Sequence, residues 1–166
     1  MIRTHLEPGD VGAIIRLHGL VYARECGFDR TFEAYVAAPL ARMIQDAHPD
    51  ERVWVADRDG EVVGCIAIVR CEPGVAQLRW FLVHPSCRGT GLGKRLLSDA
   101  IAFSRERKYR TVMLWTVAGL PASAHLYRRA GFRKVEERPP ARLWGVTVIE
   151  ERHELPLDPQ HGTRGR

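Results

Sequence analysis

The sequence predicts one α/β domain with a mixed, mostly antiparallel sheet of about seven strands flanked by helices. Three observations support this. Residues 52–83 contain successive β-rich runs separated by turn signals, residues 92–103 have a helical apolar pattern, and another β-rich run follows at residues 111–117. A strand, helix and strand in this order imply a parallel pair with a right-handed crossover. The length of 166 residues fits one hydrophobic core.

The N-terminal part is predicted to be a short strand followed by two helices. Residues 2–8 are predicted as a strand, and Pro8-Gly9-Asp10 as a turn that caps the first helix. This helix should end near Gly27. A second helical pattern runs from Thr31 to His48 and should be broken or bent near Pro39. The apolar face of the first helix consists of Val11, Ile14, Ile15, His18, Val21 and Tyr22.

The centre of the sheet is predicted from three consecutive strands. Two β-rich runs flank Asp59-Gly60, which is a strong hairpin signal. The next strand covers residues 75–83, and its wholly apolar end, Trp80 to Val83, predicts burial on both faces. These strands therefore lead directly into the turn at residues 88–93.

The remaining elements follow that turn. A helix is predicted with an apolar stripe, then the buried strand 111–117, and then a short helix that starts at Pro121 and stops at Gly131. The runs "RKVEER" and "WGVTVIEERHEL" should supply the last strands. The domain is expected to span residues 1–156, and residues 157–166 are expected to form a disordered basic tail. The apolar stripe consists of Leu92, Leu96, Leu97, Ala100, Ile101 and Phe103.

Composition excludes several classes of protein. Hydrophobic content of 45% and charged content of 27% are ordinary for a globular protein, and no apolar run is long enough to cross a membrane. The first ten residues lack the apolar core of a secretory signal, and the four cysteines form no CxxC pair, so we expect a cytoplasmic location and no metal. The net charge of +5 has no accompanying nucleic-acid motif, so nucleic acid is not an expected partner.

The glycine-rich turn 88–93 is the clearest functional signal. It joins an apolar strand to a helix, and a helix N-terminus presents unpaired N–H groups to which glycines allow an anion close access. The nucleoside-triphosphate loop does not fit, because it would need glycine at Arg88 and serine or threonine at Arg95. The dinucleotide fingerprint does not fit either, because its last glycine would fall on Lys94 or Leu96. The pattern that remains is R-x-x-G-x-G.

This pattern after "VHP" resembles the pyrophosphate-binding motif of the GNAT superfamily of acyl-CoA-dependent N-acyltransferases. The later "HLYRRAGF" resembles the L-Y-x-x-x-G-F signature of the same superfamily. The text from "LRWFLVHP" to "AGF" is most similar to the acetyltransferase half of proteins that fuse a MarR-type DNA-binding domain to a GNAT domain. The resemblance implies a parallel strand pair splayed around acyl-CoA, with acetyl-CoA as the acyl donor.

The resemblance also implies roles for individual residues. The backbone of Leu82 and Val83 would bind the pantetheine arm, and Tyr127 would bind the cofactor and protonate the departing thiolate. Family members often have Asn seven residues before this tyrosine, where this chain has Leu120. The backbone N–H groups expected to hold the pyrophosphate are those of Arg88, Gly89, Thr90, Gly91, Leu92, Gly93 and Lys94.

Transfer to an amine also requires a base, because a protonated amine has no lone pair. Glu25 is the leading candidate, since it shares a helix face with Tyr22 and His18. Glu72 is the alternative base, and Arg79 or Trp80 would line the acceptor pocket, together with Tyr22. Three acidic residues hint at a cationic acceptor: Glu25, Asp29 and Glu33.

The sequence therefore predicts an N-acetyltransferase that moves an acetyl group from acetyl-CoA to a primary amine by direct attack in a ternary complex. A non-catalytic acyl-CoA sensor and a regulatory partner of a DNA-binding protein are the alternatives, and a homodimer is left open. Structural interpretations also exist for each site residue. The glycines could form only a tight turn, Tyr127 could be a packing residue, and Glu25 could be a rim carboxylate paired with a cation.

Overall fold

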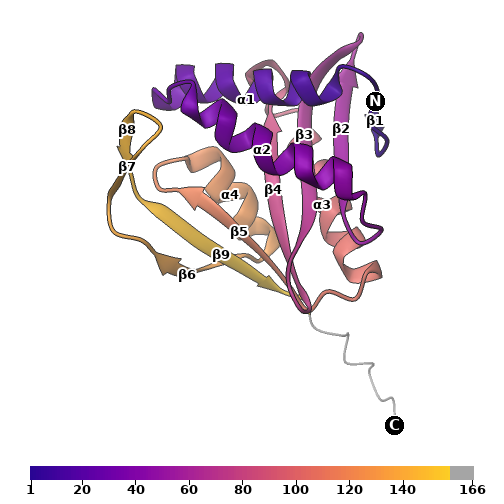
Figure 1. Cartoon of the computed structure of the whole chain (residues 1–166). Coiled ribbons are helices and arrows are strands. Elements are labelled where there is room, and N and C mark those ends of the chain that lie inside the picture. The colour runs from indigo at the N-terminus through magenta and orange to yellow at the C-terminus, as the bar shows by residue number, and fades with distance from the viewer. Residues whose placement is uncertain (158–166) are drawn as a thin grey trace.

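The computed structural model describes residues 1–157, and it contains a mixed seven-stranded sheet with four helices (Figure 1). The strand order is β1-β2-β3-β4-β5-β9-β6, and β7 and β8 form a separate hairpin. This confirms the predicted fold class. The strands are β1 (Ile2–Arg3), β2 (Arg52–Arg58), β3 (Glu61–Glu72), β4 (Val75–Val83), β5 (Thr111–Val117), β6 (Arg133–Glu137), β7 (Ala141–Leu143), β8 (Val146–Val148) and β9 (Glu150–Pro156). The helices are α1 (Asp10–Cys26), α2 (Thr31–Asp46), α3 (Leu92–Glu106) and α4 (Pro121–Ala130), with a 3-10 turn at Pro85–Cys87.

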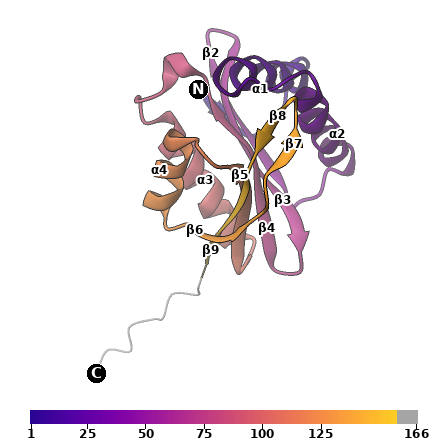
Figure 2. The same ribbon diagram turned by 90° about the vertical axis from the view of Figure 1, so that its left-hand side faces the viewer.

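The helices cover both faces of the sheet. Helices α1 and α2 pack on one face, and α3 and α4 pack on the other (Figure 2). Each face has its own hydrophobic cluster: Ile14, Val36 and Leu40 belong to the first, and Leu96 and Leu114 belong to the second. The sheet is therefore the middle layer of three.

The N-terminal region differs in detail from the sequence-based prediction. The first strand has only two residues, and the N-cap of α1 is Gly9, without a side-chain cap. Asp10 instead accepts hydrogen bonds from the Arg3 guanidinium, at 2.7 Å for one pair of atoms, and from the Glu7 N–H at 2.6 Å. Helix α2 is not broken, because it continues through Pro39 to Asp46. Tertiary packing thus outweighs the local cost of the proline.

Strands β2, β3 and β4 form the predicted antiparallel meander. Asp59 and Gly60 both have positive φ, at 56° and 81°, as the tight hairpin turn requires. A register shift between Cys65 and Ala67 marks a bulge in β4, where Trp80 has φ of 48°. The bulge changes the direction in which the end of β4 presents its side chains.

The parallel pair between β4 and β5 is short. It comprises three residue pairs, Val75–Thr111, Ala76–Val112 and Gln77–Met113. Beyond Gln77 the two strands are no longer paired, whereas β5 stays paired with β9 over its full length from Thr111 to Val117. The parallel pair is confirmed, and the sheet opens at the end that leads into the glycine-rich turn.

Burial along the end of β4 is alternating rather than complete. Trp80 and Leu82 are buried at 8% exposure each, whereas Phe81 and Val83 are only partly buried. The prediction of burial on both faces was therefore wrong. The physical reason is that Phe81 and Val83 face an open cavity, so their apolar character reflects a binding surface rather than core packing.

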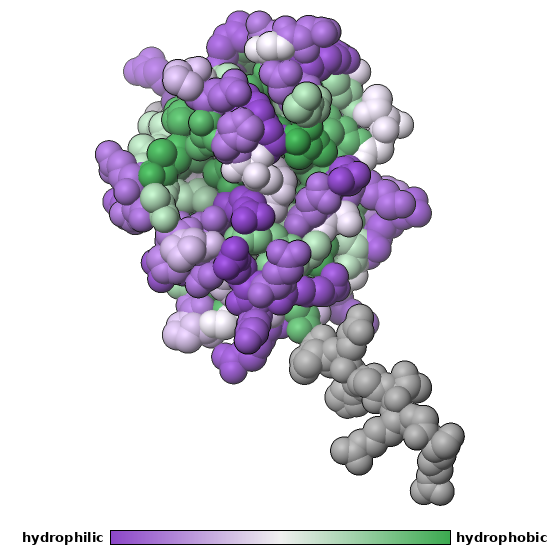
Figure 3. Space-filling view, turned by 90° about the vertical axis from the view of Figure 1, so that its right-hand side faces the viewer, coloured by the Kyte–Doolittle hydropathy of each residue, from purple (hydrophilic) through white to green (hydrophobic). Residues whose placement is uncertain are grey.

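The C-terminal part contains the hairpin β7–β8, which the sequence analysis did not separate from the last strands. The hairpin lies beside α1 and α2 (Figures 1 and 2), where Trp144 is 4.9 Å from Phe28 between ring centres. The side of the molecule at the β1–β2 edge carries mainly hydrophilic side chains with hydrophobic areas between them (Figure 3). None of the helices in residues 1–157 is long and apolar enough to cross a membrane. Of the predicted basic tail, residues 158–166 lie outside the described residues. Its first residue, Leu157, is buried in the core, and its N–H donates to the Arg110 carbonyl at 2.7 Å.

Candidate active site

A cavity of about 1210 Å³, called the large cavity below, lies where β4 and β5 separate. Its walls come from the end of β4, the glycine-rich turn, α3 and α4. Apolar side chains on its walls include Phe81, Val83, Leu97 and Leu126. The volume exceeds the roughly 300–1,000 Å³ of common ligand pockets. The cavity is therefore large enough for a long ligand.

The glycine-rich turn is open toward this cavity. Gly89 and Gly91 have φ of 77° and 87°, and a Cβ atom placed on either would meet no atom within 4 Å. The first backbone hydrogen bond inside α3 runs from the N–H of Arg95 to the carbonyl of Gly91 at 3.0 Å. The N–H groups of residues 92–94 precede this bond, as at any helix N-terminus. The turn can therefore accept an anion against its backbone.

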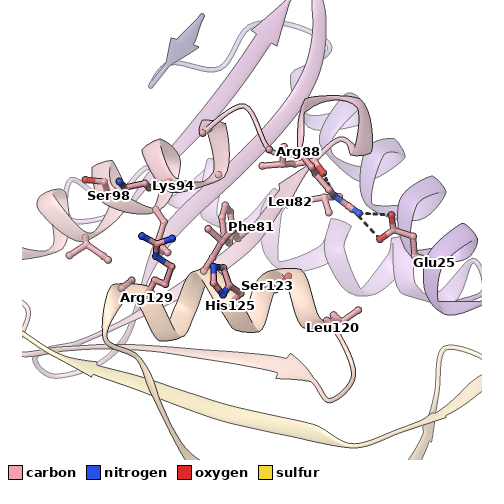
Figure 4. Close-up of a pocket in the computed structure, with 18 of the residues that line it drawn as sticks. Glu25, Phe81, Leu82, Arg88, Lys94, Ser98, Leu120, Ser123, His125 and Arg129 are labelled. Carbon is pink, nitrogen blue, oxygen red and sulfur yellow. Dashed lines mark hydrogen bonds and ion pairs between the residues drawn. The ribbon is translucent and has the colours of Figure 1, made fainter.

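Several cationic side chains line the large cavity. Lys94 and Arg105 belong to α3, whereas Arg129 belongs to α4 on the opposite wall. Lys94 and Arg129 lie at the same end of the cavity, near Ser98 (Figure 4). Cations on two facing helices, together with a helix N-terminus, suit a ligand with several phosphate groups.

Arg88, the first residue of the motif, forms an ion pair with Glu25 of α1. Its two terminal nitrogens donate to the two Glu25 oxygens at 2.8 and 3.0 Å, as the dashed lines in Figure 4 show. The Arg88 Nε donates to the carbonyl of Val83 at 3.3 Å. Both side chains are about one-third exposed, so the pair lies at the rim of the cavity. It connects α1 to the glycine-rich turn.

Most of the residues predicted to bind the cofactor line the large cavity. They are Leu82, Val83, Arg88, Gly89, Gly91, Gly93 and Lys94. Thr90 and Leu92 do not line it with their side chains, and the Thr90 hydroxyl instead donates to the carbonyl of Cys87 at 2.7 Å. Leu120, at the position where the family often has Asn, also lines the cavity.

A second cavity, of about 100 Å³, adjoins the large one on the other side of β4. Four residues line both cavities: Tyr22, Phe81, Leu120 and Ser123. The second cavity therefore meets the large one at the opening between β4 and β5. Its remaining wall is rich in aromatic side chains and comes from α1, α2, β4, β5, α4 and β9, together with the loop residues Phe28 and Trp144.

Tyr127 and Trp80 line the second cavity and not the large one. Tyr127 is 6% exposed, and its ring lies 5.9 Å from Phe81 between ring centres. Burial raises the pKa of the Tyr127 hydroxyl well above its usual range. The hydroxyl is therefore protonated at neutral pH and can serve as a hydrogen-bond donor on the wall of the second cavity.

His18 is also part of the wall of the second cavity. It is 3% exposed, and its Nδ1 lies 2.8 Å from the carbonyl oxygen of Ile14. Burial lowers the pKa of the imidazole to about 4. His18 is consequently neutral at physiological pH, and the hydrogen bond fixes the proton on Nδ1.

The other predicted site residues lie in different places. Arg79 lines the second cavity. Glu72 pairs with Val75 at the start of β4, at the far end of that strand from the glycine-rich turn. Asp29 and Glu33 line neither cavity. Within residues 1–157, His, Cys, Asp and Glu side chains form no cluster that could hold a metal ion.

Sequence reasoning missed the wall that α4 contributes, above all His125 and Arg129. The signal was present, because "HLYRRAGF" was already assigned to the site through its tyrosine. Helical spacing places Arg129 three to four residues from both Leu126 and His125, so these side chains share a face of α4. The aromatic wall of the second cavity had no comparable local signal.

Comparison with known proteins agrees with this geometry. The sequence model of the Acetyltransferase (GNAT) family matches residues 19–132. An uncharacterised N-acetyltransferase of Schizosaccharomyces pombe is 30% identical over 118 residues, which cover 69% of this chain and 72% of the relative. An IAA acetyltransferase of Azospirillum brasilense is 34% identical over 112 residues, which cover 67% of this chain and 71% of the relative.

Solved structures share the fold. A ribosomal-protein-alanine N-acetyltransferase from Brucella melitensis superposes with a TM-score of 0.74 at 23% identity, covering 95% of this chain and 99% of its own. An acetyltransferase from Salmonella typhimurium, solved with its cofactor acetyl-CoA, gives a TM-score of 0.72 at 23% identity, covering 99% of this chain and 97% of its own.

Proposed function

Because the chain belongs to the acetyltransferase (GNAT) family, we propose that it transfers an acetyl group from acetyl-CoA to a primary amine. The observation that carries this proposal is the large cavity, which combines a glycine-rich helix N-terminus with the open edge of β4. The amine would attack directly in a ternary complex. Its nitrogen bonds to the acetyl carbon, the carbon–sulfur bond breaks, and the amine proton leaves with a base.

Donor binding would use the turn and both helices of the large cavity. The backbone N–H groups from Arg88 to Lys94 would hold the pyrophosphate, and Lys94 and Arg129 would neutralise further phosphate charge. The backbone edge of Leu82 and Val83 would pair with the pantetheine arm, because β5 does not occupy that edge and, within residues 1–157, only the Val83 carbonyl there accepts a bond, from the Arg88 side chain. Acetyl-CoA supplies the activated thioester when it is bound there.

Tyr127 would stabilise the thiolate as it departs. Its hydroxyl is protonated, and its ring lines the second cavity 5.9 Å from that of Phe81, which lines both cavities, so a thioester at their junction would lie next to it. Since burial raises the pKa of this phenol, it would act mainly by donating a hydrogen bond to the developing negative charge.

Glu25 is the proposed base, and its ion pair with Arg88 sets a condition on that role. Both carboxylate oxygens accept hydrogen bonds from Arg88, so Glu25 would take the proton on a lone pair that Arg88 leaves open or after one of these bonds is released. We expect Glu25→Gln to lower kcat/KM at least tenfold with less than a threefold change in the KM for acetyl-CoA, and Asp29→Asn to change neither. A change confined to the KM for acetyl-CoA would instead show that Glu25 acts through Arg88.

We also propose that the protein works in the cytoplasm. The four cysteines, Cys26, Cys65, Cys71 and Cys87, are all free thiols in the described structure, as a reducing compartment favours.

The first experiment is a thermal-shift comparison with acetyl-CoA, CoA, ATP and NAD. A ligand present at about one hundred times its Kd stabilises a protein by about 2.7 kcal/mol, which gives a clear rise in Tm. We expect a rise with the two CoA species alone. Release of free thiol from acetyl-CoA in the presence of a panel of primary amines then tests transfer, and binding without turnover of any amine would contradict the enzymatic proposal.

A further inference from the structure

The polar groups of the second cavity indicate which kind of amine it accepts, and this inference rests on the proposed function. The cavity measures about 100 Å³, against about 1210 Å³ for the large cavity. It suits a smaller group than the large cavity does. The charges and hydrogen-bond donors on its wall therefore decide what that group carries.

Arg79 is a cation on this wall with no acidic partner in the described part of the chain. Its guanidinium contacts two aromatic rings instead, at 5.0 Å from the centre of Trp80 and 5.9 Å from that of Tyr35. The side chain is partly buried, so leaving it without an anion is unfavourable unless a ligand supplies one.

A second donor on the same strand is also unsatisfied. The indole Nε1 of Trp80 is buried and has no hydrogen-bond partner within residues 1–157. Trp80 lines the second cavity and follows Arg79 in the bulge of β4. Buried donors without acceptors are rare, and an acceptor atom of a ligand in the adjoining cavity would satisfy this one if the indole turned toward it.

The other titratable groups on the wall are already neutralised. Glu150 forms an ion pair with Arg138 at 3.1 Å. His18 is neutral because it is buried, and its Nδ1 donates to the Ile14 carbonyl. Tyr22 and Tyr127 are protonated because burial raises the pKa of both phenols. The one unneutralised charge among these groups is that of Arg79, and it is positive.

The acidic residues that suggested a cationic acceptor lie elsewhere. Glu25 is paired with Arg88 at the rim of the large cavity, and Asp29 accepts from the N–H of Thr31 at 2.9 Å. The Glu33 side chain packs beside Gly19 on α1. None of the three lines the second cavity. A polyamine or amino-sugar would thus bring positive charge toward Arg79.

We propose that the acceptor is a small amine that also carries a carboxylate, with the carboxylate bound by Arg79 and the amine directed to the junction of the two cavities. A planar guanidinium suits a carboxylate because it can donate two parallel hydrogen bonds. Phe81 lies two residues beyond Arg79 and belongs to both cavities, so the acid group and the reacting amine are separated by a short stretch of β4.

The test uses matched pairs of amines that differ only in the carboxylate. L-Methionine, L-leucine, L-phenylalanine and L-lysine are each compared with the corresponding decarboxylated amine and with the amino-acid amide, and thiol release is measured. For at least one amino acid, we expect kcat/KM to exceed the values for its decarboxylated amine and for its amide at least tenfold. Preference for the decarboxylated amine would overturn the proposal, and equal use of the amide would indicate a peptide-like acceptor instead.

Arg79→Gln is the matching variant, and Arg42→Gln, an exposed arginine of α2, is its control. We expect Arg79→Gln to remove the preference for the carboxylate by raising the KM for the amino acid at least tenfold, with kcat within threefold. Arg42→Gln should leave both constants unchanged. An unchanged preference in Arg79→Gln would exclude Arg79 as the binding residue.

A binding measurement separates this proposal from the proposed function. The protein has four tryptophans, and the indole N–H signal of Trp80 can be assigned by NMR with Trp80→Phe. Titration of the free protein with the four amino acids should shift that signal in the wild type and not in Arg79→Gln. No shift with any of them would contradict the carboxylate site even if acetyl-CoA raises the Tm. A shift of the Trp80 signal without a rise in Tm on addition of acetyl-CoA would instead contradict acetyl-CoA as the acyl donor.

Discussion

At the scale of single residues, the chemistry depends on burial as much as on residue type. Tyr127 is surrounded by the rings of Phe81, Phe132 and His153, between 5.6 and 6.4 Å away by ring centres. This environment keeps its hydroxyl protonated and oriented. The sequence motif identified the residue, but only the packing shows that it faces the second cavity.

Replacement of Tyr127 by Phe tests the role of that hydroxyl. We expect kcat to fall about 10- to 100-fold, at or below the lower end of the range for loss of an acid–base group, with little change in the KM for acetyl-CoA. Tyr109→Phe is the control, since the Tyr109 hydroxyl donates to the Asp50 carbonyl at 2.9 Å and lines neither cavity. An unchanged kcat in Tyr127→Phe would leave Tyr127 as a packing residue.

His18 gives a pH dependence with a defined sign. Its pKa is about 4 in the folded state and about 6.5 when unfolded, so the unfolded chain binds more protons between these values. The contribution of His18 to stability is complete above pH 6.5 and is lost as the pH falls toward 4. It amounts to roughly 3 kcal/mol at most.

The measurement is urea unfolding of the wild type and His18→Leu between pH 4 and 7. We expect the fall in unfolding free energy across this range to be smaller in the variant, by up to about 3 kcal/mol. Equal falls in both proteins would mean that His18 titrates normally in the folded state.

At the scale of elements, the first turn of α3 packs closely against both β4 and α4, and Gly93 makes this close packing possible. A Cβ atom on Gly93 would lie 3.2 Å from Leu126 and 3.5 Å from Val83, in contrast to the open space above Gly89 and Gly91. Gly93 therefore controls the width of the large cavity, whereas the other two glycines permit the positive φ of the turn.

Gly93→Ala should thus narrow the cavity without unfolding the helix. We expect the KM for acetyl-CoA to rise about tenfold, while the unfolding free energy changes by less than about 1 kcal/mol, because alanine favours the helix by a similar amount. Gly12→Ala in α1, where a Cβ atom would meet nothing within 4 Å, should stabilise the protein and leave this KM unchanged. Equal KM values in both variants would show that Gly93 does not limit ligand binding.

The sequence predicted single elements and motifs better than the contacts between segments that lie far apart in the chain. The Asp59-Gly60 hairpin, the Gly131 helix stop and the parallel pair were all confirmed, because each has a short-range signal. The ion pair between Glu25 and Arg88 joins residues 63 positions apart, and no local pattern indicates it. The second cavity was likewise unpredictable, since its aromatic wall is assembled from several separate elements.

At the scale of the whole molecule, a nearly buried ion pair and the short pairing of β1 with β2 hold the N-terminal segment to the domain. The side chains of Arg3 and Asp10 are 10% and 7% exposed. The hydrogen bonds from Arg3 hold the pKa of the Asp10 carboxyl below its usual value. The stabilisation from this group is therefore present above about pH 4 and is lost as the pH falls through the lower folded-state pKa.

Asp10→Ala should destabilise the whole domain, because it leaves Arg3 buried without its anion. We expect the unfolding free energy at pH 7 to fall by about 3 kcal/mol. Asp46→Ala, at an exposed position near the end of α2, should change it by less than about 0.5 kcal/mol. Similar effects of the two substitutions would contradict a stabilising role for the Arg3–Asp10 pair.

The short parallel pairing of β4 and β5 also divides the sheet into two parts. One part contains β1 to β4, and the other contains β5, β9 and β6. Three residue pairs join β4 to β5, and the Gly74 carbonyl accepts hydrogen bonds from the N–H groups of Arg110 and Thr111 beside them. Amide hydrogens in each part should therefore exchange with deuterium as a separate cooperative unit. A ligand lying across the opening would join the units, so acetyl-CoA should slow exchange in β4 and β5 together and make their exchange rates converge.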